Sequence, residues 1–236
     1  MSPRQIDPEL SAHLIEAAAK LLAEEGPKAL STRRLAAAVG TSTMAVYTRF
    51  GGKEDLVRAM VGEGFRLLNQ RMTEVGETAD CVEDVVALGW AYRRNAQEHR
   101  HLYGVMFGGS QLGGFALTDD DRQHGRYTLS ILVRAIERCM VGGRFRPGDS
   151  QLVAHQMWIA LHGLVALELG GYLIDPYNAD VCFEAQVCGL LVGAGEDPGE
   201  AAMTMKRARE RRSDPPGAEG AGPAAPAAEE PGPDGS

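Results

Sequence analysis

Basic and hydroxyl-bearing side chains gather in one short part of the chain, between residues 31 and 53. Five of the residues from 31 to 60 are basic and two are acidic, a net charge of +3 within a chain whose net charge is −8. Guanidinium and ammonium groups bind phosphate oxygens, and a guanidinium group also pairs with a guanine edge. These residue types therefore offer the chemistry of anion and nucleic-acid recognition.

Arg33 and Arg34 lie just inside an expected helix that Ser31 caps. Cations near a helix N-terminus oppose the helix dipole at a cost of about 0.3–1 kcal/mol each, and stability alone would favour Glu there. An external anion reverses that balance, because backbone amides and two guanidinium groups can share one phosphate or a guanine edge. Lys53 repeats the pattern at the start of another expected helix, after two glycines.

Two short helices must position these side chains. We expect one from Ser31 to Gly40, where a left-handed glycine allows a tight exit, and another from Ser42 or Thr43 to Gly51. Four apolar residues can pack inward: Leu35, Val39, Val46 and Phe50. The outward positions of the second helix are small or amphipathic, which suits a DNA major groove roughly 12 Å wide; they are Thr43, Met44, Ala45, Tyr47 and Thr48. The alternative is a helix corner that only packs.

The rest of the chain is also expected to be helical, because no segment shows the alternation of apolar and polar residues that is typical of a strand. We therefore expect an all-α protein. The expected helices run from Asp7-Pro8-Glu9 to Glu25, from about 53 to 75, and over about 80–98, 101–107, 119–141, 149–170 and 176–193. We expect three parts: a helix-turn-helix domain over 8–60 (motif about 31–50), a helical body over 61–198, and a basic segment with a Pro/Ala/Gly tail over 199–236. From Ser213 the composition predicts disorder. We interpret Lys206–Arg212 as a solvated helix end, with an extra phosphate contact as the alternative.

The stretch "GPKALSTRRLAAAVGTSTMAVYTRFGGKEDLVRAM" resembles the DNA-binding domain of TetR-family transcriptional regulators. The features that carry the resemblance are Gly40, Val46-Tyr47, Phe50 and Lys53-Glu54-Asp55-Leu56, over about residues 8–60. Thr41 departs from the pattern, since the family usually has an aliphatic residue there. The resemblance implies a three-helix DNA-binding head and an all-helical body that dimerises and binds a small effector. By position, it places Arg33, Thr43, Met44 and Ala45 at base-reading sites, and Thr32, Tyr47 and Lys53 at phosphate-contacting sites; we add Arg34 to the phosphate contacts.

The segment from His155 to Tyr172 would form a helix that is apolar on almost every side, which predicts burial on several sides. Trp158-x-x-x-His162-Gly163 resembles the Trp-His-Gly motif of a subgroup of TetR effector domains. His162 is either a core histidine satisfied by a carbonyl or a Tyr, or a polar anchor in an apolar effector pocket. The candidate pocket residues, each with plain core packing as the alternative, are Trp90, Met106, Phe107, Tyr127, Trp158 and His162.

Several other classes of protein are disfavoured. We expect no membrane span, no signal peptide, and reduced thiols at the four cysteines, as in a cytoplasmic protein. The His99-x-His101 pair and the pair Cys182 and Cys188 lack structural-zinc spacing, so we expect no metal and no cofactor. "GGSQLGG" is no nucleophile elbow and "GLLVGAGEDPG" follows no strand, so we expect no catalytic residues and no enzyme.

The sequence therefore predicts a DNA-binding transcriptional regulator. We expect a homodimeric repressor that a small, largely apolar effector releases from a double-stranded DNA operator. The alternative is a helical small-molecule-binding protein that does not touch DNA.

Overall fold

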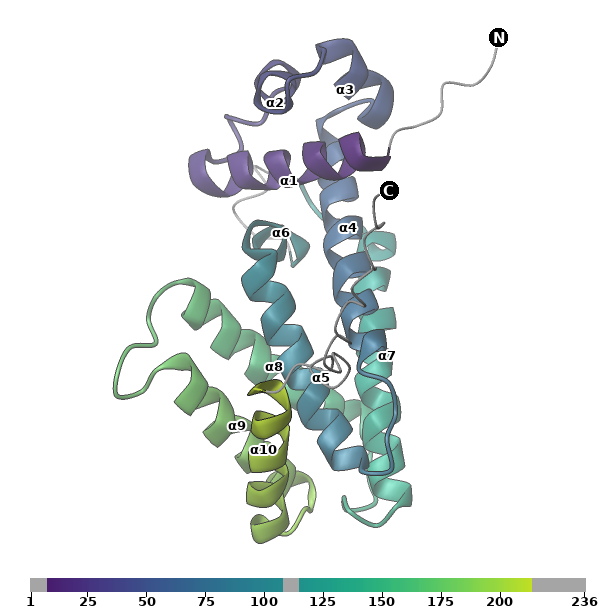
Figure 1. Cartoon of the computed structure of the whole chain (residues 1–236). Coiled ribbons are helices and arrows are strands. Elements are labelled where there is room, and N and C mark those ends of the chain that lie inside the picture. The colour runs from purple at the N-terminus through teal and green to yellow at the C-terminus, as the bar shows by residue number, and fades with distance from the viewer. Residues whose placement is uncertain (1–7, 108–114, 214–236) are drawn as a thin grey trace, which may run out of the picture.

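The computed structural model describes residues 8–107 and 115–213, and all regular secondary structure in that part of the chain is helical (Figure 1). The helices are α1 (Pro8–Glu25), α2 (Thr32–Val39), α3 (Thr43–Phe50), α4 (Lys53–Glu74), α5 (Cys81–Glu98), α6 (Arg100–Met106), α7 (Asp119–Val141), α8 (Ser150–Leu169), α9 (Ala179–Ala194) and α10 (Pro198–Ser213). The all-α expectation is confirmed. The predicted Asp7 cap, the GGSQLGG segment and the tail beyond Ser213 lie outside the described residues.

Local capping explains the two short helices of the head, which comprises α1, α2 and α3. The Ser31 hydroxyl accepts a hydrogen bond from the Arg34 amide at 3.3 Å, and the Ser42 hydroxyl accepts one from the Ala45 amide at 3.1 Å. Gly40 has φ 70° and ψ 34°, so α2 ends in the left-handed conformation that glycine adopts without strain. The predicted helix-turn-helix geometry is therefore present.

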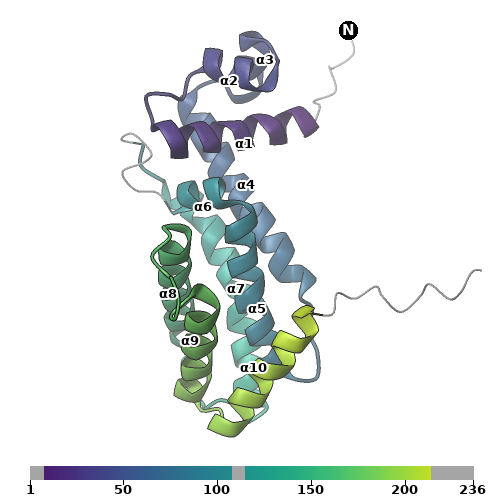
Figure 2. The same ribbon diagram turned by 60° about the vertical axis from the view of Figure 1, so that its left-hand side comes forward.

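Helix α4 joins the head to the body, which comprises α4 to α10. In Figure 1 the head lies across one end of the molecule and α4 runs away from it along the body. The short helix α6 packs against both α1 and α4, so it lies at the junction of head and body. Figure 2 shows α8 and α9 side by side as an outer layer against α5 and α7.

The structure adds a helix after residue 198, where the sequence predicted only a basic segment and a tail. Residues 198–213 form α10, which packs against α5 and α9 and buries Ala201, Met205 and Ala208. The basic composition of this segment concealed a narrow buried stripe, because Ala and Met at helical spacing are weak signals beside seven charged residues of the same helix. Lys206–Arg212, which we interpreted as a solvated helix end, belongs to this helix: Lys206, Arg209 and Glu210 are exposed, whereas Ala208 is buried.

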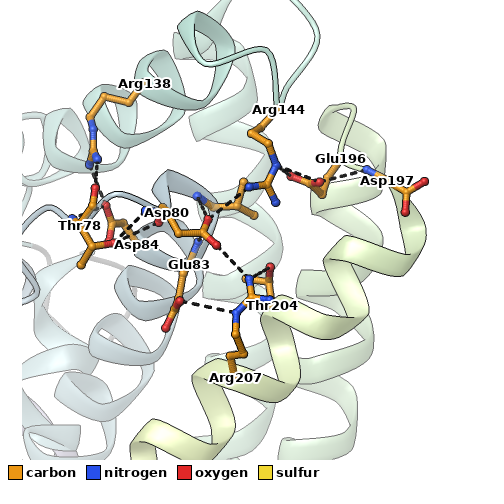
Figure 3. Close-up of polar contacts among 11 residues, drawn as sticks. Thr78, Asp80, Glu83, Asp84, Arg138, Arg144, Glu196, Asp197, Thr204 and Arg207 are labelled. Carbon is orange, nitrogen blue, oxygen red and sulfur yellow. Dashed lines mark hydrogen bonds and ion pairs between the residues drawn. The ribbon is translucent and has the colours of Figure 1, made fainter.

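A network of charged side chains holds α10 in place (Figure 3). Arg207 of α10 pairs with Asp80 at 2.9 Å, and Arg144 pairs with Glu196 at 3.0 Å just before α10 begins. The Glu196 side chain is 3% exposed, so its charge requires a partner. Arg207 is thus engaged within the body, which leaves the phosphate-contact alternative for this residue without support.

Helix α8 is long and apolar enough to cross a membrane by length and composition alone, in contrast to the sequence-based expectation of no such segment. It packs against α7 and α9 and against α5, as a helix of a helical bundle does. Its remaining apolar surface is exposed and includes Leu152, Ile159 and Leu167.

Candidate DNA-binding surface and effector cavity

Three of the four predicted base-reading residues lie on α3, and the fourth lies on α2. Met44 is 69% exposed and Thr43 is exposed, while Ala45 is half-buried beside the buried Val46. Arg33 on α2 is exposed and makes no ion pair with a described residue. Three of the four predicted base-reading residues are therefore accessible, and they include one guanidinium group, which suits contact with base edges in a major groove.

Three of the predicted phosphate-contacting residues meet at one place. Thr32, Tyr47 and Lys53 line a hollow of about 60 Å³ between the start of α2, the outer face of α3 and the start of α4. Tyr47 is 63% exposed, so its ring and hydroxyl group reach solvent. Their hydroxyl, phenol and ammonium groups are of the types that bind phosphate oxygens, so the prediction that they contact phosphates stands as a prediction.

Two of the predicted phosphate contacts have partners inside the head. The Arg34 guanidinium group pairs with Glu25 at 2.6 Å, with both side chains nearly half exposed. The Lys53 ammonium group donates a hydrogen bond to the Pro27 carbonyl at 2.7 Å. A phosphate must replace or share these partners, and both are exposed enough for the exchange to cost little.

The body holds a cavity of about 380 Å³ among α4, α5, α6, α7, α8 and α9, which we call the central cavity. Most of its lining is apolar, and α4 contributes Phe65, Leu68 and Met72. Other lining residues include Leu88, Met106, Phe107, Leu129, Trp158, Leu161 and Leu190. A largely apolar cavity of this size is in the range of small-molecule sites.

The structure brings together only half of the predicted pocket residues. Met106, Phe107 and Trp158 line the central cavity. Trp90 stacks on Phe183 with ring centroids 3.9 Å apart, and Tyr127 is 65% exposed, so neither lines this cavity. Helical periodicity placed Tyr127 on the correct helix, but its position within the turn directs the ring to solvent.

His162 forms a polar cluster with Tyr92 and Tyr103 instead of lining the central cavity. Its Nδ1 atom lies 2.7 Å from the Tyr103 hydroxyl and 3.2 Å from the Tyr92 hydroxyl, and the two hydroxyls are 3.0 Å apart. Burial lowers the pKa of His162 below 6.5. Burial also raises the pKa of Tyr92 to about 12 and raises the pKa of Tyr103. Burial thus favours the neutral imidazole, and the contact of His162 with two tyrosine hydroxyls matches the core-histidine alternative.

A second hollow of about 720 Å³ lies between head and body, and His162 and Tyr103 line it together with α1 residues Ala23 and Glu24. Phe107 lines both this hollow and the central cavity. The Tyr92, Tyr103 and His162 cluster therefore lies between the two spaces.

Sequence reasoning missed the polar residues of the central cavity. Arg122 and Arg126 on α7, His155 on α8 and Gln186 on α9 all line it. The Gln186 Oε1 atom is buried and has no hydrogen-bond partner among the described residues. The spacing of Arg122 and Arg126, four residues apart, placed them on one helix face, but nothing in the sequence showed that this face borders a cavity.

Two family models match this chain. The model "Bacterial regulatory proteins, tetR family" matches residues 14–60, and "Tetracyclin repressor-like, C-terminal domain" matches residues 85–190. The chain belongs to the TetR family. The first match contains α2, α3 and the start of α4, and the second contains most of the helices around the central cavity. The chain is accordingly a DNA-binding transcriptional regulator with a ligand-binding body, in agreement with the sequence-based prediction.

Relatives agree with this assignment. The chain is 28% identical over 181 residues to the uncharacterized HTH-type transcriptional regulator Rv0681 of Mycobacterium tuberculosis, covering 76% of this chain and 79% of the relative. It has the fold of the TetR-family regulator PfmR of Thermus thermophilus (24% identity, TM-score 0.62, covering 78% of this chain and 99% of the other). It also has the fold of the transcriptional regulator FadR of Bacillus subtilis, solved with stearoyl-CoA (20% identity, TM-score 0.63, covering 77% and 98%). The Trp-His-Gly resemblance stays a prediction.

Proposed function

We propose that this TetR-family regulator is a cytoplasmic homodimeric repressor, without enzymatic activity, that leaves its operator when a small, largely apolar molecule occupies the central cavity. The position of α4 carries the proposal. Phe65, Leu68 and Met72 line the cavity, and the same helix begins at Lys53 beside the DNA-binding hollow. A ligand that changes the packing of α4 therefore acts on the element that orients the head.

The dimer uses the exposed apolar surface of α8 and α9. Leu152, Ile159 and Leu167 of α8 and Val181 of α9 are each about half exposed or more. Two copies of this surface related by a two-fold axis would cover it, and a two-fold dimer presents two heads to a palindromic operator. Leu164 and Leu190 are less suitable interface residues, since Leu164 is buried within the chain and Leu190 lines the central cavity.

The ligand class follows from the cavity lining. Leu, Met, Phe and Trp side chains dominate it, so an apolar chain or ring system gains most by entering. The structural relative solved with stearoyl-CoA, which carries a long apolar chain, supports this class of effector for the present chain.

Operator binding is tested by fluorescence anisotropy with promoter fragments from the protein's own genomic neighbourhood. If Arg33 reads a base, Arg33→Ala weakens the specific site by about 1–3 kcal/mol and relaxes specificity. Lys53→Ala weakens all sequences evenly and flattens the salt dependence. Arg94→Ala, at an exposed site in the body, is the matched control. Full retention of operator binding by both Arg33→Ala and Lys53→Ala would reject these roles. Absence of any operator would favour the alternative of a binding protein that does not touch DNA.

A further inference from the structure

The central cavity has a charged mouth of one sign. Among the described residues, its lining includes three side chains that are or can be cationic, Arg122, Arg126 and His155, and no Asp or Glu. All three are exposed, so they lie at the solvent side of an otherwise apolar space. The whole chain has a net charge of −8, so a group of basic side chains without an acidic residue among them departs from the overall composition.

The positive charges of Arg122 and Arg126 are not fully neutralised by the groups that these side chains contact. Arg126 donates to the neutral amide oxygen of Gln123 at 3.1 Å, a contact that does not neutralise its charge. Arg122 pairs with Asp119 at 3.2 Å, but the Asp119 side chain is 89% exposed and sits three residues away on the same helix. An ion pair of that kind contributes little, so Arg122 can exchange Asp119 for another anion at small cost.

The two guanidinium groups lie on one face of α7. Residues four apart on a helix are neighbours on its surface, so Arg122 and Arg126 can approach a single anionic group together. Gly125, between them, also lines the cavity, and a Cβ atom there would lie 3.1 Å from the Phe65 ring of α4. The close contact of α4 with this turn of α7 brings the apolar wall and the cationic mouth together.

We propose that the effector is an amphipathic anion whose apolar chain fills the central cavity and whose acidic end binds Arg122 and Arg126 at the mouth. The inference rests on the proposed function and adds the charge of the ligand to it. A free carboxylate and a phosphate ester share this chemistry. A neutral molecule of equal apolar area forgoes the two guanidinium contacts, and a cation is repelled by them.

The test compares three probes of one chain length: decanoate, decyl phosphate and decanol. Isothermal titration gives their affinities for the full chain, and Trp158 fluorescence in a Trp90→Phe background reports binding in the cavity, because the chain has two tryptophans and Trp158 lines this space. We expect both anions to bind about 10-fold more tightly than decanol, the size expected for two exposed charge contacts. We expect added salt to weaken the anions and not the alcohol.

The matched variants lie on one helix. The double variant Arg122→Gln with Arg126→Gln should weaken decanoate about 10-fold and leave decanol and operator binding unchanged. Arg134→Gln, at an exposed α7 position outside the cavity, should change none of these quantities. A preference for decyl phosphate over decanoate, lost in the double variant, would identify a phosphate-bearing effector; the reverse preference would identify a carboxylate.

The outcomes that overturn the inference are distinguishable from failure of the proposed function. If decanol binds as tightly as decanoate and releases the operator equally well, the central cavity is an effector site, but the proposal that the effector has an acidic end is wrong. The same conclusion follows if the double variant keeps full affinity for the anions. If no probe changes Trp158 fluorescence or operator binding, both the inference and the assignment of the central cavity fall.

Discussion

Substitution of Gly64 tests the contact through which the cavity and α4 meet. Gly64 lies in the interior of α4, and a Cβ atom built on it would lie 2.5 Å from Cγ and 2.8 Å from Sδ of Met106. Met106 belongs to α6 and lines the central cavity. In Gly64→Ala, the Met106 side chain must therefore move, or α4 and α6 must separate.

The change in folding stability caused by Gly64→Ala is the sum of two opposing effects. Replacing a helix-interior glycine with alanine stabilises the folded state by about 0.5–1 kcal/mol. Overpacking a close contact destabilises it by about 1–3 kcal/mol. Gly62→Ala is the matched control, because it lies in the same helix and a Cβ atom there meets nothing within 4 Å. We expect Gly62→Ala to be more stable than the wild type, and Gly64→Ala to be less stable than Gly62→Ala by about 1–3 kcal/mol.

The assay is urea unfolding of the wild type, both single variants, Met106→Ala, and Met106→Ala combined with Gly64→Ala. If Met106 causes the cost, the double-mutant cycle shows coupling, since removal of its side chain relieves the contact. Operator release by decanoate should also change in Gly64→Ala and not in Gly62→Ala. Equal stability of the two alanine variants, with additive effects at Met106, would refute the argument from close packing.

Three further predictions address the dimer, the histidine cluster and α10. Ile159→Glu should dissociate the dimer and abolish operator binding together, measured by light scattering and anisotropy. Val141→Glu, at a still more exposed apolar site outside α8 and α9, should do neither. Burial holds the pKa of His162 below 6.5, so in mildly acidic solution the imidazole takes up a proton more readily in the unfolded chain than in the folded one. The wild type should therefore lose stability as the pH falls below 6.5. His162→Gln should lose less stability over that range, as measured by urea unfolding. Met205→Ala should cost about 2 kcal/mol in the same assay, while Met203→Ala, half exposed on the same helix, should cost less than about 0.5 kcal/mol; equal small effects would mean that α10 does not dock as described.

Local signals were sufficient to predict the helices of the head. Ser31, Gly40 and Ser42 act within one turn of their own positions, as caps and as a left-handed helix end, so their effect can be inferred without knowledge of the fold. The same holds for Asp80 and Asp149, which accept hydrogen bonds from amides at the starts of α5 and α8. Their positions agree closely with the predicted helix starts.

The lining of the central cavity could not be predicted in the same way, because it depends on how six helices face one another. Trp90 and Trp158 are equally apolar, yet one stacks on Phe183 and the other lines the cavity. Arg122 and Arg126 lie in a charged segment that reads as solvent-exposed, and they are exposed, but at the mouth of an apolar space. Helical periodicity predicts which residues share a face of a helix, but only the packing of the helices decides whether that face borders a cavity, another helix or solvent.

Thermodynamic linkage places a further requirement on the proposed mechanism. Both helices that connect head and body contribute to the central cavity: α4 through Phe65 and Leu68, and α6, which packs against α1, through Met106. A ligand shifts the heads only to the extent that it binds one arrangement of these helices more tightly than the other. A coupling of about 1–3 kcal/mol would weaken operator binding about 5- to 150-fold, and saturating operator must then weaken decanoate binding by the same factor. If the operator leaves decanoate affinity unchanged while decanoate displaces the operator, the displacement does not run through the central cavity, and the proposed coupling is wrong.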